Sequence, residues 1–135
     1  MPKLVQQSVA LPASPERLYD MYMDPSQHAA FTGAPVVISA QPGSPFQAFG
    51  DLLSGRMLAA VPKRMIVQAW RANHWKPEDL DSTLVLTFWP DPAGGRIDLV
   101  HVNVPQQDFR GVTQGWKKYY WLPWRKYLLR RAGGK

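Results

Sequence analysis

Residues 115–128 read GWKKYYWLPWRKYL, and this stretch decides the fold of the chain. It holds six aromatic residues and four cations. The aromatic residues recur at close to helical spacing, which predicts a C-terminal helix with one face buried against a concave surface. The interleaved lysines and arginines predict that the rest of this helix is hydrated and positively charged.

This helix carries more aromatic residues than one buried stripe holds. In a regular α-helix, Trp121 and Trp124 do not both lie on the face shared by Trp116 and Tyr120. We therefore expect at least one of these two tryptophans to be partly exposed, or to be buried in a subunit interface such as that of a homodimer. Tryptophan and tyrosine are enriched in such interfaces.

Length and composition limit the class of protein. The 135 residues predict a single domain over residues 1–135. The chain has no cysteine, so neither a disulfide framework nor thiolate chemistry is expected, and a cytoplasmic location is the default. No segment approaches the ~18 consecutive apolar residues of a membrane span, and no secretory signal is recognisable.

Charge is distributed unevenly along the chain. Residues 109–135 hold eight basic and no acidic residues, whereas residues 1–108 hold eight basic and ten acidic residues. Such an asymmetry is typical of a surface that meets an acidic partner, although a basic helix face also serves solubility alone. Sequence-specific nucleic-acid binding is not expected, because the aromatic residues lie on a helix and not on an open sheet. The cations expected to meet a partner are Lys117, Lys118, Arg125, Lys126, Arg130 and Arg131.

The order of elements follows from turn and cap signals. Lys3–Leu11 is expected to form a first strand, and Ser14-Pro15 and Asp24-Pro25 each predict the start of a short helix. Thr32-Gly33 predicts the end of the second helix. The long helix is expected from about Gly111. Between the helices, the predicted strands are Pro35–Gln41, Phe46–Gly50, Leu52–Val61, Lys63–Ala72, Ser82–Trp89 and Arg96–Val104.

Short connections between these strands favour antiparallel pairing. The predicted fold class is therefore α+β: a curved antiparallel sheet of about seven strands is wrapped around a long C-terminal helix, with two short helices between the first two strands. A curled sheet that grips a helix leaves a cavity at its open end, where side chains do not fill the tapering space.

Several short motifs occur along the chain in a recognisable order. They are Phe46-x-x-Phe49-Gly50, Ser54-Gly55, Val61-Pro62-Lys63-Arg64-Met65-Ile66-Val67-Gln68-x-Trp70-Arg71, Trp75-Lys76-Pro77, Ser82-Thr83-Leu84-Val85-Leu86-Thr87-Phe88, Val104-Pro105 and Gly115-Trp116-x-x-Tyr119-Tyr120. Together they resemble one family, the activator of heat shock protein 90 ATPase homologue group. The resemblance spans about residues 15–130 and implies the helix-grip fold of the START/SRPBCC superfamily. It also implies relatives that include both co-chaperone domains and small stand-alone bacterial proteins. Pro123 departs from the pattern, and we expect a kink there because proline removes a helix donor.

Signals for catalysis are absent from the sequence. His28, His74 and His101 lack the spacing of a metal site, and no nucleophile elbow, phosphate loop or dinucleotide fingerprint occurs. No metal, cofactor or catalytic residue is therefore predicted. His101 shares a strand face with Ile97 and Leu99, so it points inward. We favour a core histidine satisfied by neighbouring polar groups over a ligand anchor.

These observations favour non-enzymatic binding of a small hydrophobic or aromatic ligand between the sheet and the C-terminal helix. A co-chaperone-like interaction module that acts through the basic helix is the first alternative. A cyclase- or hydratase-type enzyme of the same superfamily is the second. The residues expected to bind the ligand are Phe31, Phe49, Trp70, Phe88, His101, Trp116 and Tyr120.

Overall fold

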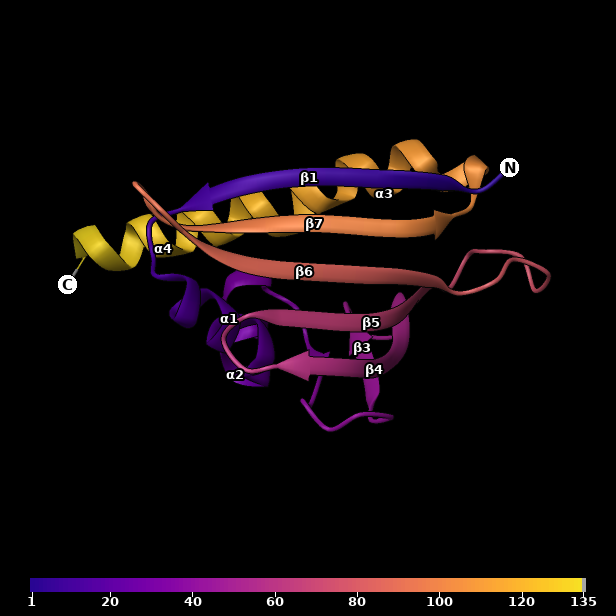
Figure 1. Ribbon diagram of the computed structural model, residues 1–135, viewed down its shortest axis with the longest axis horizontal. Helices are drawn as coiled ribbons and strands as arrows, with labels where there is room; N and C mark the ends of the chain where they lie inside the picture. The colour runs from indigo at the N-terminus through magenta and orange to yellow at the C-terminus, as the bar shows by residue number, and fades with distance from the viewer. Residues whose placement is uncertain (135) are drawn as a thin grey trace.

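An antiparallel sheet of seven strands, in the order β1-β7-β6-β5-β4-β3-β2, forms one layer of the computed structural model, which describes residues 1–134. Figure 1 shows the sheet with the C-terminal helical segment lying behind β1 and β7. The predicted α+β helix-grip architecture is confirmed. The strands are β1 (Lys3–Leu11), β2 (Val36–Val37), β3 (Pro45–Ala48), β4 (Leu53–Val61), β5 (Met65–Ala72), β6 (Ser82–Asp91) and β7 (Gly94–Val104).

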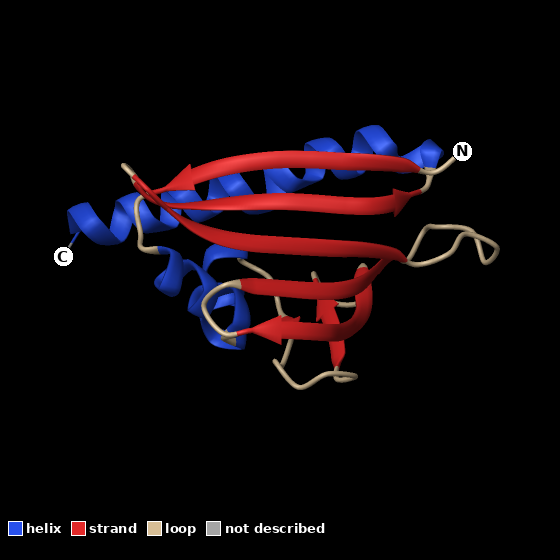
Figure 2. Cartoon of the chain, viewed as in Figure 1, coloured by secondary structure: helices blue, strands red, loops and turns tan. Residues whose placement is uncertain are grey.

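Two short helices, α1 (Pro15–Met23) and α2 (Pro25–Thr32), connect β1 to β2, and both are capped as the sequence predicts. The Ser14 side chain accepts a hydrogen bond from the Arg17 backbone N–H, and the Asp24 carboxylate accepts one from Ser26. Gly33, at φ 79°, ends α2 in the left-handed conformation that glycine adopts without cost. Figure 2 shows the two helices together below the C-terminal helix.

Several expected boundaries differ from those of the structure. The strand expected over Pro35–Gln41 is paired only at Val36–Val37, because residues 38–44 leave the sheet in a loop whose Gly43 N–H donates to the Met57 carbonyl. The C-terminal helical segment begins earlier than Gly111. A 3₁₀ turn, η1 (Gln106–Asp108), leads directly into α3 (Phe109–Trp116).

The C-terminal helical segment is interrupted by a π-turn, η2 (Lys117–Trp121), before it continues as α4 (Leu122–Gly134). The Leu122 N–H donates to the Lys117 carbonyl, which is an i→i+5 bond. The irregularity lies just ahead of Pro123, whose ring would otherwise press on the carbonyl one turn earlier. The predicted disturbance at Pro123 is thus present as one widened turn.

This π-turn corrects the expectation that Trp121 or Trp124 is exposed. One extra residue in a turn shifts the angular position of every later residue around the helix axis back by one helical step, about 100°. Trp121 and Trp124 therefore share the buried face of Trp116 and Tyr120, and their exposed fractions are 5% and 0%. Phe31 of α2 stacks on Trp124, with ring centroids 4.1 Å apart. Neither tryptophan needs a subunit interface to be buried.

Gly55 in β4 marks a place where backbones approach closely. A Cβ atom at this position would lie 1.8 Å from the Ala69 carbonyl oxygen of the neighbouring strand β5. Only glycine fits there. In the described residues 1–134, no helix is both long and apolar enough to cross a membrane.

Candidate ligand-binding pocket

A pocket of about 390 Å³ lies between β5, the turn from β3 to β4, and the underside of α3. Apolar side chains make up most of its wall, with a few polar groups at one end. The lining residues are Phe49, Leu52, Leu53, Trp70, Ala72, His74, Asp108, Gly111, Val112, Gly115, Trp116, Tyr119 and Tyr120.

Local structure explains why these residues meet. Val112, Gly115 and Trp116 are spaced i, i+3 and i+4 on α3 and so share one helix face. Trp70 and Ala72 are two residues apart on β5, so both side chains lie on its inner face. Gly115 carries no side chain, so the helix leaves room beside Trp116 at this point.

Four of the seven residues expected to bind a ligand line this pocket: Phe49, Trp70, Trp116 and Tyr120. The other three lie elsewhere in the core. Phe31 is packed between His28 and Trp124, and Phe88 contacts Tyr19 edge-on. His101 lies behind the pocket wall, with Trp70 and Trp116 as its aromatic neighbours. That these residues bind a ligand stays a prediction.

His101 is fully buried and bonded on both ring nitrogens. Its Nδ1 accepts from the Trp116 indole at 3.2 Å. Its Nε2 lies 2.7 Å from the Ser82 hydroxyl, which itself donates to the Trp70 carbonyl. This arrangement requires a neutral ring protonated on Nε2. Burial lowers the pKa of His101 from 6.5 to about 3.

His28 is a second buried histidine that the sequence did not single out. Its Nδ1 donates to the Tyr22 carbonyl, so its Nε2 accepts from the Tyr120 hydroxyl at 2.8 Å. Burial lowers the pKa of His28 to about 4 and raises the pKa of Tyr120. The polar tip of Tyr120 is therefore directed into the core, and its ring is left to form the pocket wall.

The polar end of the pocket is built from residues that sequence reasoning missed. His74 Nε2 lies 3.1 Å from Asp108 Oδ2, and the Trp75 indole donates to the same oxygen at 2.7 Å. Both His74 and Asp108 line the pocket. They are distant in sequence and lie in irregular segments, so no spacing rule connects them. Among the described residues, no group of three or more potential ligands could hold a metal ion.

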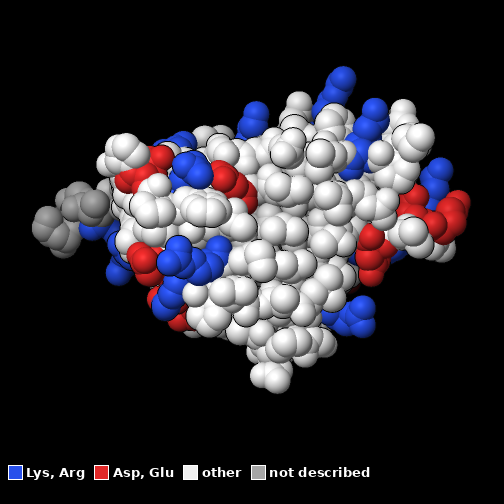
Figure 3. Space-filling view, viewed as in Figure 1, with Lys and Arg blue, Asp and Glu red and all other residues white. Residues whose placement is uncertain are grey.

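The basic helix face is largely exposed, as predicted. Lys117, Lys118, Lys126, Arg130 and Arg131 are on the surface. Arg125 differs, because it is partly buried and donates to the Ala10 carbonyl at 2.6 Å. Three large apolar side chains are exposed along the same segment: Tyr119, Leu122 and Leu129. The opposite side of the molecule, the outer face of the sheet in Figure 3, has an uncharged centre and charged margins.

Comparison with known proteins gives consistent results. The profile of a family described as "Activator of Hsp90 ATPase homolog 1-like protein" matches residues 12–122. The human "Activator of 90 kDa heat shock protein ATPase homolog 1" is 32% identical over 107 residues, which are 79% of this chain and 31% of the human protein. The chain therefore spans about a third of the length of this relative.

Solved structures of other proteins share the fold. A protein from Mesorhizobium loti superposes with a TM-score of 0.80 at 20% identity, over 95% of this chain and 98% of that chain. The "Aha1 dimer" from Colwellia psychrerythraea superposes with a TM-score of 0.70 at 13% identity, over 87% of this chain and 90% of that chain. At these identities the likeness concerns the fold alone.

Proposed function

Because the chain belongs to the Activator of Hsp90 ATPase homolog 1-like family, we propose that it is a cytoplasmic binding protein whose pocket takes a small apolar or aromatic ligand. The pocket between β5 and α3 is the observation that carries this proposal. Its volume, about 390 Å³, lies within the usual range of small-molecule sites.

The composition of the wall supports an aromatic ligand in particular. Phe49, Trp70, Trp116, Tyr119 and Tyr120 surround the cavity. The hydrogen-bonding tips of Trp116 and Tyr120 are occupied by His101 and His28, so their rings face the pocket without an unmet polar group. Aromatic rings that are held in place in this way present flat, apolar surfaces, on which a planar ligand stacks favourably.

The test uses Gly115, which lines the pocket and has open space beside it. Outside the backbone of its own helix and its two chain neighbours, the only described atom within 4 Å of an added Cβ belongs to the Tyr119 ring, at 3.8 Å. Gly115→Leu therefore fills the pocket without removing a packing contact. Titration with the uncharged fluorescent probe N-phenyl-1-naphthylamine is expected to give saturable 1:1 binding to the native protein and none to Gly115→Leu. Gln114→Leu, on the exposed side of the same helix turn, is the control and is expected to bind normally.

A second candidate function is an interaction module that contacts an acidic protein, such as a heat-shock chaperone, through α4 and η2. Exposed Leu122 and Leu129 lie among surface cations, and charge next to exposed apolar groups is typical of a transient interface. The name of the human relative suggests Hsp90 as the partner to test.

For this second candidate, Lys126→Glu together with Arg130→Glu is expected to weaken binding to purified Hsp90, measured by calorimetry. Native binding is expected to weaken steeply as salt is added, because exposed charges are screened within ~8 Å at physiological ionic strength. Binding that does not depend on salt, or no binding by the native protein, rejects this role for the helix.

A further inference from the structure

We propose that His74 and Asp108 form the polar anchor of the pocket, and that the ligand they select carries a hydroxyl group of the phenol class. In this arrangement the ligand O–H donates to Nδ1 of His74 while the aromatic body of the ligand fills the apolar part of the pocket. The inference rests on the proposed ligand-binding function and names the class of ligand for that site.

The first observation is the orientation of Asp108. It occupies the position before α3 where an aspartate usually accepts hydrogen bonds from the first backbone N–H groups of the helix, but it makes no such capping bond. Its Oδ2 accepts instead from the Trp75 indole at 2.7 Å and contacts His74 Nε2 at 3.1 Å. The carboxylate is therefore held by a buried tryptophan and aligned with the imidazole.

The second observation is the proton that this alignment assigns to His74. A carboxylate only accepts hydrogen bonds, so Nε2 must carry the proton that lies between the two groups. In the neutral ring, Nδ1 then has a free lone pair. Nδ1 makes no hydrogen bond to any other group in the part of the chain that the structure describes, and the ring lines the pocket. In this proposal, Nδ1 is the acceptor that the ring offers to the pocket.

The third observation is the surroundings of this acceptor. The indole N–H of Trp116 and the hydroxyl of Tyr120, which belong to other wall residues, are bonded away from the cavity. The indole N–H of Trp70, also a wall residue, is buried without a hydrogen-bond partner among the described residues, and the oxygen of a ligand hydroxyl is a group that it could donate to. An anionic ligand group at His74 would lie near the Asp108 carboxylate and be repelled. A neutral hydroxyl donor satisfies Nδ1 without this repulsion.

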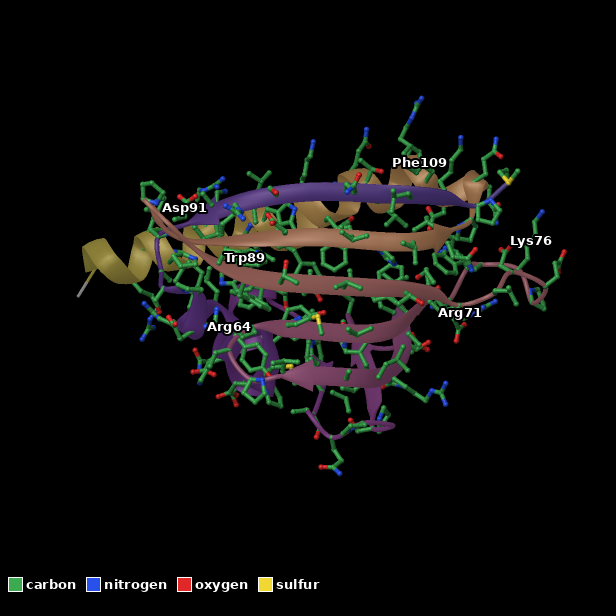
Figure 4. All side chains as sticks on the ribbon, in the orientation of Figure 1. Arg64, Arg71, Lys76, Trp89, Asp91 and Phe109 are labelled. Atoms are coloured by element: carbon green, nitrogen blue, oxygen red, sulfur yellow. The ribbon has the colours of Figure 1, made fainter. Side chains whose placement is uncertain are left out.

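The anchor is placed at the mouth of the pocket and is held by its own loop. The His74 side chain is 60% exposed and that of Asp108 is 17% exposed. Arg71, at the end of β5, donates to the carbonyls of Lys76 and Asp79 and so fixes the loop that follows His74. In Figure 4, Arg71 and Lys76 lie at the same end of the sheet as Phe109, where α3 begins. The hydroxyl of the ligand thus sits near water and its ring lies inside.

The experiment compares two probes by isothermal titration calorimetry: 2-naphthol and 2-methoxynaphthalene. They share one ring system and differ in whether the oxygen donates a hydrogen bond. The native protein is expected to bind 2-naphthol about five-fold more tightly, the ratio that corresponds to one net hydrogen bond. His74→Phe keeps an aromatic ring and removes the acceptor, so this preference is expected to vanish while 2-methoxynaphthalene binds as before.

Asp108→Asn and Asp108→Leu together test the proton assignment. Trp75 and His74 both bond to Oδ2, so an asparagine oxygen at this position accepts from both and Nε2 keeps its proton. The preference for 2-naphthol is therefore expected to persist in Asp108→Asn and to weaken in Asp108→Leu, which removes the acceptor that holds the proton on Nε2. A purely structural role for Asp108 would change the affinities for both probes together.

The outcomes distinguish a failure of the proposed anchor from a failure of the proposed pocket function. If both probes bind with equal affinity, or if the preference survives in His74→Phe, the anchor is rejected and the pocket function stands. If neither probe binds the native protein, the pocket function and the anchor both fall.

Discussion

The indole N–H of Trp116 donates to Nδ1 of His101 across 3.2 Å, and this bond joins the C-terminal helical segment to β7. On its other side, His101 contacts the Ser82 hydroxyl at 2.7 Å, and through it the backbone of β5. One buried, neutral imidazole thus connects the helix to three strands. Protonation of this ring destabilises the folded state, because burial disfavours the charged form and so lowers the pKa of His101.

Stability is expected to fall as the pH falls below about 6.5, the value at which histidine titrates in the unfolded chain. The folded pKa is about 3 for His101 and about 4 for His28, so the unfolded state binds protons more tightly throughout this window. Each histidine then lowers the free energy of unfolding by up to ~1.4 kcal/mol per pH unit. Urea unfolding at pH 7, 6, 5 and 4.5 measures the slope.

His101→Gln preserves both hydrogen bonds, because an amide accepts from Trp116 and donates to Ser82. This variant is expected to show about half of the native slope between pH 6 and 4.5, because His28 then remains as the buried histidine with a lowered pKa. If His101→Gln shows the same slope of unfolding free energy against pH as the native protein, His101 does not contribute to the acid sensitivity.

Trp116→Ala is expected to cost ~3–5 kcal/mol of unfolding free energy, the usual loss for a buried tryptophan. Trp116 is only 3% exposed and packs on Tyr120 and Trp121, although one side of it forms the pocket wall. Trp116→Phe keeps most of the packing and removes the donor to His101, so a loss of about 1–2 kcal/mol is expected. Chemical denaturation checks both values, and an unchanged melting temperature in Trp116→Ala would refute the role of this residue in closing the sheet.

Arg125→Ala is expected to destabilise the fold by about 1.5 kcal/mol, the lower end of the range for hydrogen bonds to charged groups. Its guanidinium holds the Ala10 carbonyl at 2.6 Å near the end of β1. The adjacent Lys126 is exposed, so Lys126→Ala is a matched control with an expected change near zero. Equal effects of the two substitutions on urea midpoints would show that Arg125 is only a surface cation.

Gly55→Ala is expected to cost roughly 3 kcal/mol, at the upper end for overpacking, because the new methyl group collides with backbone that cannot move aside. The clash is with the Ala69 carbonyl at 1.8 Å. Gly115→Ala meets only the Tyr119 ring at 3.8 Å and is expected to be neutral or slightly stabilising, since alanine favours helix. Thermal unfolding of the two variants provides the comparison, and a Gly55→Ala protein as stable as the native one would contradict the close approach of β4 and β5.

The sequence predicts the parts of this fold that depend on local chemistry. Ser14 and Asp24 cap helices where expected, and Gly33 ends the second one, because caps and left-handed glycines act within a few residues. The inward position of His101 was also predictable from the alternation of β7. Its environment as a satisfied core histidine matches the interpretation that we favoured.

The remaining features depend on contacts between distant segments. The pair formed by His74 and Asp108 joins a loop to the start of α3, and neither residue carries a periodic signal. The burial of both Trp121 and Trp124 depends on η2, and a π-turn has no reliable sequence signature. The sequence predicts Phe31 and Phe88 in the pocket because they are large and apolar, a property that does not distinguish a cavity wall from a filled core.

The π-turn at Lys117–Trp121 also means that the C-terminal helix contains one residue more than a regular helix would need to bury the same side chains. Removing an exposed residue from it, such as Lys118, is therefore expected to leave Trp116, Trp121 and Trp124 on one side of an ordinary α-helix. Deletion of Lys126 is expected to be harmful, because α4 is a regular helix without an extra residue, and the deletion would rotate Leu128 away from the core. Lys117–Trp121 is thus the place where this helix, otherwise fixed by its tryptophans, is expected to tolerate the loss of one residue.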